Sequence, residues 1–261
     1  MTHYKSIAAG FPCWIELGTT DQTAAKSFYT SLFGWSVIDY PLGSGDVYSM
    51  FSLRGRSVAA AYQLSQKDIG KGVPPHWSLY FAADNTDKTV MRAKSLGAAV
   101  IMDPTDVTDV GRMAVLGDPS GAVFNLWQAR RHKGFEVTNE VNALLWSELA
   151  TRDLTGSRDF YTKLFGWEAQ GHPSSPEGYL VCSKGGVSFG GIMQMTEEWG
   201  DTSAHWSCYF WVEECDQGVA RTKELGGSVC IDPWDIQGVG RIAACSDPQG
   251  ARFYLLKPQP M

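Results

Sequence analysis

The sequence predicts an α+β fold built from four modules, each consisting of a strand, a helix and three further strands. Two observations lead to this prediction: the chain repeats itself once, and each half shows the same strand and helix patterns twice. A length of 261 residues also exceeds one average domain and falls short of three. We therefore expect two similar domains with two modules in each.

The repeat rests on three blocks that occur twice in the same order. The pairs are Trp14–Trp35 with Trp146–Trp167, His76–Phe81 with His205–Phe210, and Val110–Phe124 with Val239–Phe253. Such a repeat indicates a duplicated domain. We assign the first domain to residues 1–128, a linker to 129–141 and the second domain to 142–261. The basic start of the linker is typical of a solvated segment.

The first module begins with a strand and a capped helix. Alternating apolar residues over Cys13–Leu17 predict the strand, and Asp21 follows in the position of a helix N-cap. The helix runs to Leu32 and ends at Gly34, because glycine readily takes the left-handed conformation of a C-cap. Three strands follow, near residues 35–39, 47–53 and 57–63.

The second module repeats this order. A strand over His76–Ala82 precedes a helix from Asn85 to Leu96, and Gly97 ends the helix. Three more strands are expected near Val100, Arg112–Leu116 and Val123–Trp127. The second half of the chain repeats both modules.

Charge and composition exclude several classes of function. With 22 Lys and Arg against 28 Asp and Glu, the net charge of −6 argues against a nucleic-acid binder. No apolar run approaches the roughly 20 residues of a membrane span, and the first residues lack a signal-peptide core. The six cysteines form no CxxC pair that would indicate a zinc site. We expect a soluble cytoplasmic protein.

Two motifs give the chain a family resemblance. FYTSLFGW and FYTKLFGW follow a strand and an aspartate, and GDPSG and SDPQG precede the last strand of each half. In these motifs the chain resembles the vicinal oxygen chelate superfamily, which includes glyoxalase I, bleomycin-resistance proteins and extradiol dioxygenases. The resemblance covers nearly the whole chain. It implies that paired βαβββ modules form two curled mixed-sheet cups with the helices outside.

The resemblance also implies the positions at which metal-using members hold their ion. In this sequence those positions carry Trp14, Ser78, Asn125, Trp146, Ser207 and Tyr254. Tryptophan cannot ligate a metal, and serine, asparagine and tyrosine are poor replacements for histidine and glutamate. We expect no bound metal and no cofactor.

Strand alternation assigns a polar and aromatic set of side chains to the inside of each cup. The set comprises Trp14, Glu16, His76, Ser78, Tyr80, Asn125 and Trp127 in the first half, and Trp146, Glu148, His205, Ser207, Tyr209 and Tyr254 in the second. The opposite face, which includes Trp77 and Trp206, is apolar and should pack against the helices. Aromatic walls with a few polar groups are typical of a small-molecule pocket.

Four of these residues are candidate catalytic groups. The resemblance implies that the first strands of paired modules run antiparallel, so if position 14 lies opposite position 78, Glu16 faces His76, and Glu148 faces His205 in the same way. A carboxylate beside an imidazole raises the pKa of the histidine and suits acid–base chemistry. Three alternatives stay open: a structural pair between the strands, a shifted metal site that uses Glu and His, and a swap of modules that brings Glu16 to face His205.

The sequence supports functions from different classes. The first is a metal-independent protein that binds an aromatic or hydrophobic metabolite or drug. The second is an enzyme (a lyase, an isomerase, or a hydroxylase- or dioxygenase-like protein) that uses the Glu–His pairs with or without a divalent metal. The third is a scaffold whose cups have degenerated. We expect a small molecule as the partner, no membrane or nucleic acid, and either a monomer of two pseudo-symmetric domains or a homodimer.

Overall fold

The computed structural model describes residues 7–43, 45–171 and 177–259. The elements of the first half are β1 (Pro12–Thr19), α1 (Gln22–Phe33), β2 (Ser36–Pro41), β3 (Val47–Leu53), β4 (Arg56–Gln63), α2 (Gln66–Gly70), β5 (His76–Ala82), α3 (Thr86–Ser95), β6 (Ala99–Val107), β7 (Gly111–Gly117) and β8 (Val123–Ala129). Those of the second half are β9 (Leu144–Thr151), α4 (Leu154–Phe165), β10 (Glu168–Gln170), β11 (Tyr179–Lys184), β12 (Val187–Gln194), the 3-10 helix η1 (Glu197–Trp199), β13 (His205–Trp211), α5 (Cys215–Glu224), β14 (Ser228–Ile236), β15 (Gly240–Ser246) and β16 (Arg252–Pro258).

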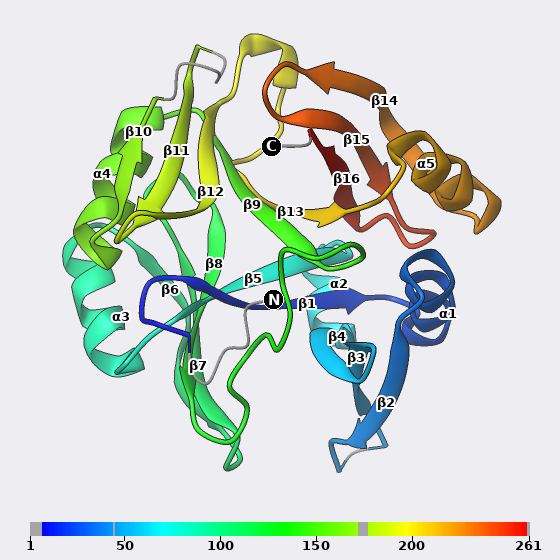
Figure 1. Cartoon of the computed structure of the whole chain (residues 1–261). Helices are drawn as coiled ribbons and strands as arrows, with labels where there is room; N and C mark the ends of the chain where they lie inside the picture. The colour runs from blue at the N-terminus through cyan, green and yellow to red at the C-terminus, as the bar shows by residue number, and fades with distance from the viewer. Residues whose placement is uncertain (1–6, 44, 172–176, 260–261) are drawn as a thin grey trace.

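The strands form two eight-stranded mixed sheets, one from each half of the chain (Figure 1). Their orders are β2-β3-β4-β1-β5-β8-β7-β6 and β10-β11-β12-β9-β13-β16-β15-β14. The first strands of the two modules, β1 and β5, pair antiparallel at the middle of the sheet, as β9 and β13 do in the other sheet. The predicted fold of four βαβββ modules is confirmed.

The long helices begin and end close to the predicted positions. The Asp21 carboxylate accepts a hydrogen bond from the backbone N–H of Ala24 at 2.9 Å, and Gly34 has a φ of 67° after the end of α1. The short helix α2 is additional to the predicted elements, and Ser65 caps its N-terminus. Within the described ranges, no helix combines the length and the apolar character that a membrane span requires.

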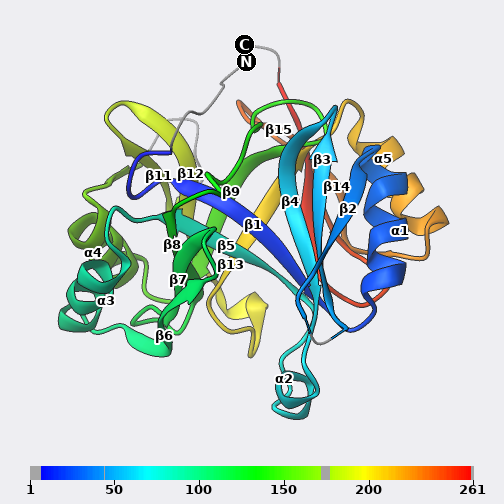
Figure 2. The same ribbon diagram turned by 90° about the horizontal axis from the view of Figure 1, so that it is seen from below.

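The two sheets pack against each other through their apolar convex faces. Strands β5 and β13 meet at the centre, while α1 lies beside α5 at one end and α3 beside α4 at the other (Figures 1 and 2). Trp77 of β5 contacts Tyr29 of α1 and Phe210 of β13, with ring centroids 5.2 and 5.4 Å apart. The helices therefore lie outside both cups, as predicted.

The FYTxLFGW and DPxG motifs meet across the interface between the halves. Tyr29 Oη donates to Asp247 at 3.1 Å, and Tyr161 Oη donates to Asp118 at 3.0 Å. Tyr29 also accepts a hydrogen bond from the Trp77 indole at 3.0 Å. These motif residues hold the two halves together and do not line a cup.

Candidate functional site

The pairing of β1 with β5 brings several predicted site residues of the first half together. Trp14 lies opposite Tyr80, and Glu16 lies opposite Ser78. The predicted pairing of position 14 with 78, and of 16 with 76, is therefore wrong by two residues. The same shift separates the predicted from the observed pairing of β9 with β13 in the second half.

The predicted Glu–His pairs are consequently not formed. His76 lies opposite Gly18, and its Nδ1 is 2.8 Å from the carbonyl oxygen of Pro74. His205 makes the equivalent 2.8 Å contact with the turn before β13. The alternative in which Glu16 faces His205 is also wrong, because β1 pairs with β5 of its own half.

Glu16 is instead held by two tyrosines. Tyr48 Oη donates to Glu16 Oε2 at 2.9 Å, and Tyr80 Oη donates to Oε1. The indole N–H of Trp14 in turn donates to Tyr48 Oη at 3.1 Å. An indole, two phenols and a carboxylate thus form one connected network in the first cup.

The second half builds the same network from corresponding residues. Tyr209 Oη donates to Glu148 Oε1 at 2.6 Å, and Tyr179 forms a second hydrogen bond with this carboxylate. The Trp146 indole donates to Tyr179 Oη at 2.9 Å. The duplication has therefore kept the whole Trp–Tyr–Glu–Tyr network in both cups.

Tyr48 and Tyr179 are absent from the predicted site residues. For Tyr48, the alternation of side chains along β3 indicates the face of the strand on which it lies. The sequence VYSMFSL buries Phe51 and Leu53 on one face of the strand, which leaves Tyr48 on the other. Strand pairing from β3 through β4 to β1 then places Tyr48 on the same face as Glu16. This step requires the order of the strands, which the sequence pattern does not provide.

The two carboxyl groups and their tyrosines have shifted pKa values. Burial raises the pKa of Glu16 and of Glu148, and the tyrosine hydrogen bonds act against this rise. Burial also raises the pKa of Tyr48 and of Tyr80 well above the usual value, and the Glu16 charge adds to the rise. The phenols therefore remain neutral donors, whereas each carboxyl group can accept a hydrogen bond from a ligand or exchange a proton with it.

The inside of the second cup carries an aromatic surface that is separate from the main core. Tyr209 and Tyr254 stack with their ring centroids 4.3 Å apart and their planes at 15°. The side chains that pack with them are Ile242, Ala244, Leu256, Leu145, Trp146, Trp234 and Ile236. Trp146 and Trp234 are only partly buried, so part of this aromatic surface is exposed.

The first cup differs because the linker covers part of it. The ring centroids of His132 and Phe135 lie 4.5 and 5.5 Å from that of Trp14. The Trp127 indole donates to the His132 carbonyl oxygen at 3.0 Å. Trp14 is only 3% exposed as a result, and Asn125 is also buried. Arg130 and Arg131, at the basic start of the linker, are exposed as expected of a solvated segment, whereas His132 and Phe135 pack on the sheet.

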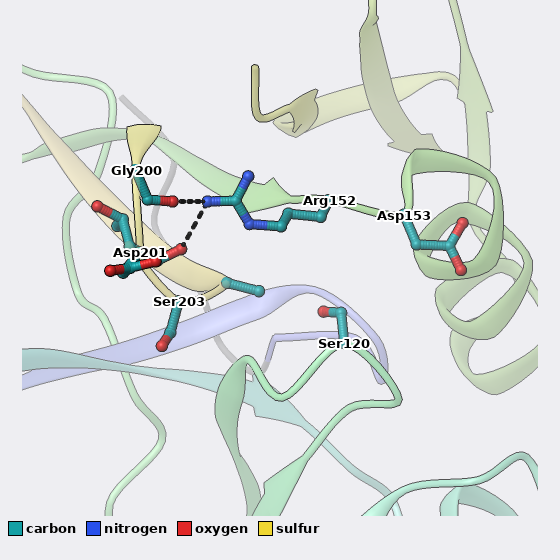
Figure 3. A pocket seen from close by; sticks show the side chains of 8 residues that line it. Ser120, Arg152, Asp153, Gly200, Asp201 and Ser203 are labelled. Atoms are coloured by element: carbon teal, nitrogen blue, oxygen red, sulfur yellow. Dashed lines mark hydrogen bonds between the residues drawn. The ribbon is translucent and has the colours of Figure 1, made fainter. Parts of the chain in front are cut away.

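A separate surface pocket of about 490 Å³ lies between the halves, and none of the cup residues lines it (Figure 3). Its most prominent charged group is the guanidinium of Arg152. This group donates to the carbonyl oxygens of Gly200 and Thr202 and so supports the loop before β13. The hydrogen-bonding capacity of Arg152 is directed at this loop, and the cups remain the better candidate sites.

Sequence similarity to known proteins shows the family to which the chain belongs. The family model for the Glyoxalase/Bleomycin resistance protein/Dioxygenase superfamily matches residues 13–126. The chain is 41% identical over 253 residues to "Putative glyoxylase CFP32" of Mycobacterium tuberculosis (strain CDC 1551 / Oshkosh), across 96% of each chain. The chain belongs to the glyoxalase/bleomycin resistance protein/dioxygenase superfamily. It is also 37% identical over 265 residues to "Anthracycline biosynthesis protein DnrV" of Streptomyces peucetius, across 96% of this chain and 94% of that protein.

Two solved structures share the fold of this superfamily member at low sequence identity. The 2,3-dioxygenase LapB from Pseudomonas sp. KL28 has a TM-score of 0.65 at 13% identity, with 96% of this chain and 92% of that one covered. The Mn(II)-bound glyoxalase from Novosphingobium aromaticivorans has a TM-score of 0.64 at 13% identity, with coverages of 96% and 83%. These likenesses concern the fold alone.

The side chains of this superfamily member do not fit the metal site that the resemblance implies. In the first cup, Trp14 donates its indole N–H to a tyrosine and has no atom that can ligate an ion, while Asn125, whose amide nitrogen donates to a backbone carbonyl, offers only a neutral amide oxygen. Among the residues that the structure describes, no three His, Cys, Asp or Glu side chains gather closely enough to hold a metal. The two Glu–Tyr networks are therefore the candidate functional groups of the cups.

Proposed function

We propose that the protein binds a flat aromatic small molecule on the inside of its cups and that this binding needs no metal ion. The observation that carries the proposal is the Trp–Tyr–Glu–Tyr network, present in both cups beside aromatic side chains. A buried carboxylate offers a fixed acceptor for a hydroxyl or amino group, and the rings beside it offer a stacking surface.

The second cup has the more accessible surface for such a ligand. Its stacked pair Tyr209 and Tyr254 forms one wall, and the partly exposed Trp146 packs against it. Stacking on aromatic side chains contributes on the order of 1 kcal/mol beyond the area that it buries. The relative named an anthracycline biosynthesis protein supports the same ligand class, because anthracyclines are planar polycyclic aromatics.

Replacing Trp146 with alanine is expected to weaken the binding of 6-hydroxy-2-naphthamide about tenfold, which corresponds to roughly 1.4 kcal/mol. The amide is neutral and planar, and its hydroxyl can donate to Glu148. Isothermal titration calorimetry of protein treated with a chelator measures the affinity. Met91→Ala, on the exposed surface of α3, is the control and should bind like the wild type. If the chelated wild type does not bind the amide, the proposal is wrong.

The raised pKa of Glu148 favours a second function, acid–base catalysis in the same cup. A carboxylate with a raised pKa is a stronger base. This property suits an isomerase or lyase that removes a proton next to a carbonyl group. Glu148 is then the base, and Tyr209, which donates its hydroxyl proton to Glu148 Oε1, positions it, in place of the predicted pair with His205.

Glu148→Gln is expected to slow such proton removal about 100-fold. The protein is incubated in D₂O with 2-acetyl-1-naphthol, and NMR follows the exchange of the methyl protons for deuterium. Glu168→Gln, the same change at an exposed position of β10 outside both cups, is the control and should exchange like the wild type. If the wild type exchanges these protons no faster than buffer does, this second function is excluded for the ketone tested.

A further inference from the structure

The two cups carry different residues at one corresponding position on the rim. In the repeated blocks VGRMAVLGDPSGAVF and VGRIAACSDPQGARF, Val123 of the first half corresponds to Arg252 of the second. Both residues are the first of the last strand in their sheet, β8 or β16. The duplication has therefore placed an apolar side chain in one cup where the other has a permanent positive charge.

Arg252 lies on the inside of the second cup. Its neighbours Phe253 and Leu255 are fully buried in the main core on the convex face, whereas Tyr254 belongs to the aromatic cluster of the cup. Since side chains alternate along a strand, Arg252 shares its face with Tyr254. Burial raises the pKa of Tyr254 to about 12, and the charge of Arg252 acts against this rise, which indicates that the two groups are near each other.

Hydroxyl groups continue the row that Arg252 begins. Arg252 pairs with Ser246 on β15, and Ser246 pairs with Ser228 on β14. The hydroxyl oxygens of Ser246 and Ser228 are 2.8 Å apart, so both side chains point to the same face. In the first cup the same row consists of Val123, Gly117 and Ala99. One cup thus has a polar rim and the other an apolar rim at the same place.

Arg252 has no acidic partner among the described residues, unlike Arg112 and Arg241. Arg112 and Arg241 each form ion pairs with two aspartates. In residues 7–43, 45–171 and 177–259, no carboxylate oxygen lies within 4.0 Å of the Arg252 guanidinium, which is exposed. An unpaired guanidinium beside hydroxyl groups is suited to bind the oxygen atoms of an anion.

The distance between Glu148 and Arg252 limits the length of the ligand that can reach both side chains. Glu148 pairs with Ser207 on β13, and β13 lies between β9 and β16. Neighbouring strands are about 4.8 Å apart, so the backbone positions of Glu148 and Arg252 are separated by about 10 Å. A molecule with two fused rings, a hydroxyl at one end and an acid at the other, has the length to reach both side chains.

We propose that Arg252 makes the second cup selective for flat aromatic acids by pairing with the ligand's carboxylate, whereas the first cup, with Val123 in its place, lacks this selectivity. The inference rests on the proposed binding function and adds the chemical class of the ligand. Glu148 accepts the hydroxyl group, the aromatic cluster stacks on the rings, and Arg252 determines the charge of the ligand that is preferred.

The test compares 6-hydroxy-2-naphthoate with 6-hydroxy-2-naphthamide, which have the same shape and differ in charge. Calorimetry is expected to give at least about tenfold tighter binding of the acid to the wild type. Arg252→Gln should remove this preference and leave the affinity for the amide unchanged. Arg221→Gln, an exposed change on α5, should keep the preference.

Val123→Arg provides the reciprocal experiment, because it should give the first cup the same preference for the acid over the amide. Binding of both compounds with equal affinity, or an acid preference that survives in Arg252→Gln, overturns the role of Arg252 and leaves the binding function standing. Binding of neither compound to the wild type overturns both proposals.

Discussion

Replacing Trp206 with alanine is expected to lower the free energy of unfolding by about 3–5 kcal/mol. Trp206 lies on the convex face of β13 and is 8% exposed. Its ring centroid is 5.2 Å from that of Phe81 in the other half, and its indole donates to Tyr161 Oη at 3.0 Å. Truncation removes a large apolar side chain and leaves a cavity between the sheets, and both effects destabilise the native state.

Urea denaturation followed by far-UV circular dichroism measures this loss. Trp77→Ala makes the corresponding change in the first half and should have an effect of the same size. Trp146→Ala is the matched control, because this tryptophan lies inside the cup and is only partly buried. If Trp146→Ala destabilises the protein as much as Trp206→Ala does, the assignment of the two faces is wrong.

Lowering the pH from 7 to 4 is expected to cost the native state about 3 kcal/mol through His132 alone. Burial lowers the pKa of His132 to about 4, with a small opposing effect of Glu136, and its Nε2 is buried without a hydrogen-bond partner among the described residues. The unfolded chain has the ordinary histidine pKa of about 6.5. Between these two values the unfolded state binds a proton that the native state does not, so stability falls as the pH falls.

Urea titrations between pH 7 and pH 4 test this dependence. His132→Leu keeps an apolar side chain over Trp14 and should flatten the curve of stability against pH across this window. Tyr40→Phe, a change at a residue that is 52% exposed, should leave the wild-type curve intact. Identical slopes for wild type and His132→Leu would show that His132 takes up its proton equally in both states.

The modules and the ends of the long helices were predictable because they depend on residues close together in the chain. Asp21 and Gly34 flank α1 as an N-cap and a C-cap, and each acts on a backbone group within its own helix. Strand order and strand register are different, because they join segments far apart. The unpredicted hydrogen bond from Tyr48 to Glu16 spans two sheet neighbours and needs both.

The error of two residues in the register has a specific cause. A shift by two keeps every side chain on the same face of the sheet, so the alternation of apolar and polar residues cannot detect it. No tight turn joins β1 to β5, and β1 has an irregularity between Pro12 and Trp14. His76 therefore lies opposite Gly18, beyond Glu16.

The two halves of the chain contact each other in the same reciprocal way as the two subunits of a symmetric homodimer. Tyr29 binds Asp247 while Tyr161 binds Asp118, the i-to-j and j-to-i pattern of an isologous interface. Covalent linkage replaces dependence on protein concentration with an effective concentration in the millimolar range. Two identical subunits must change together, since one gene encodes both. After fusion the two cups can diverge, as Arg252 in one cup and Val123 at the corresponding position of the other illustrate.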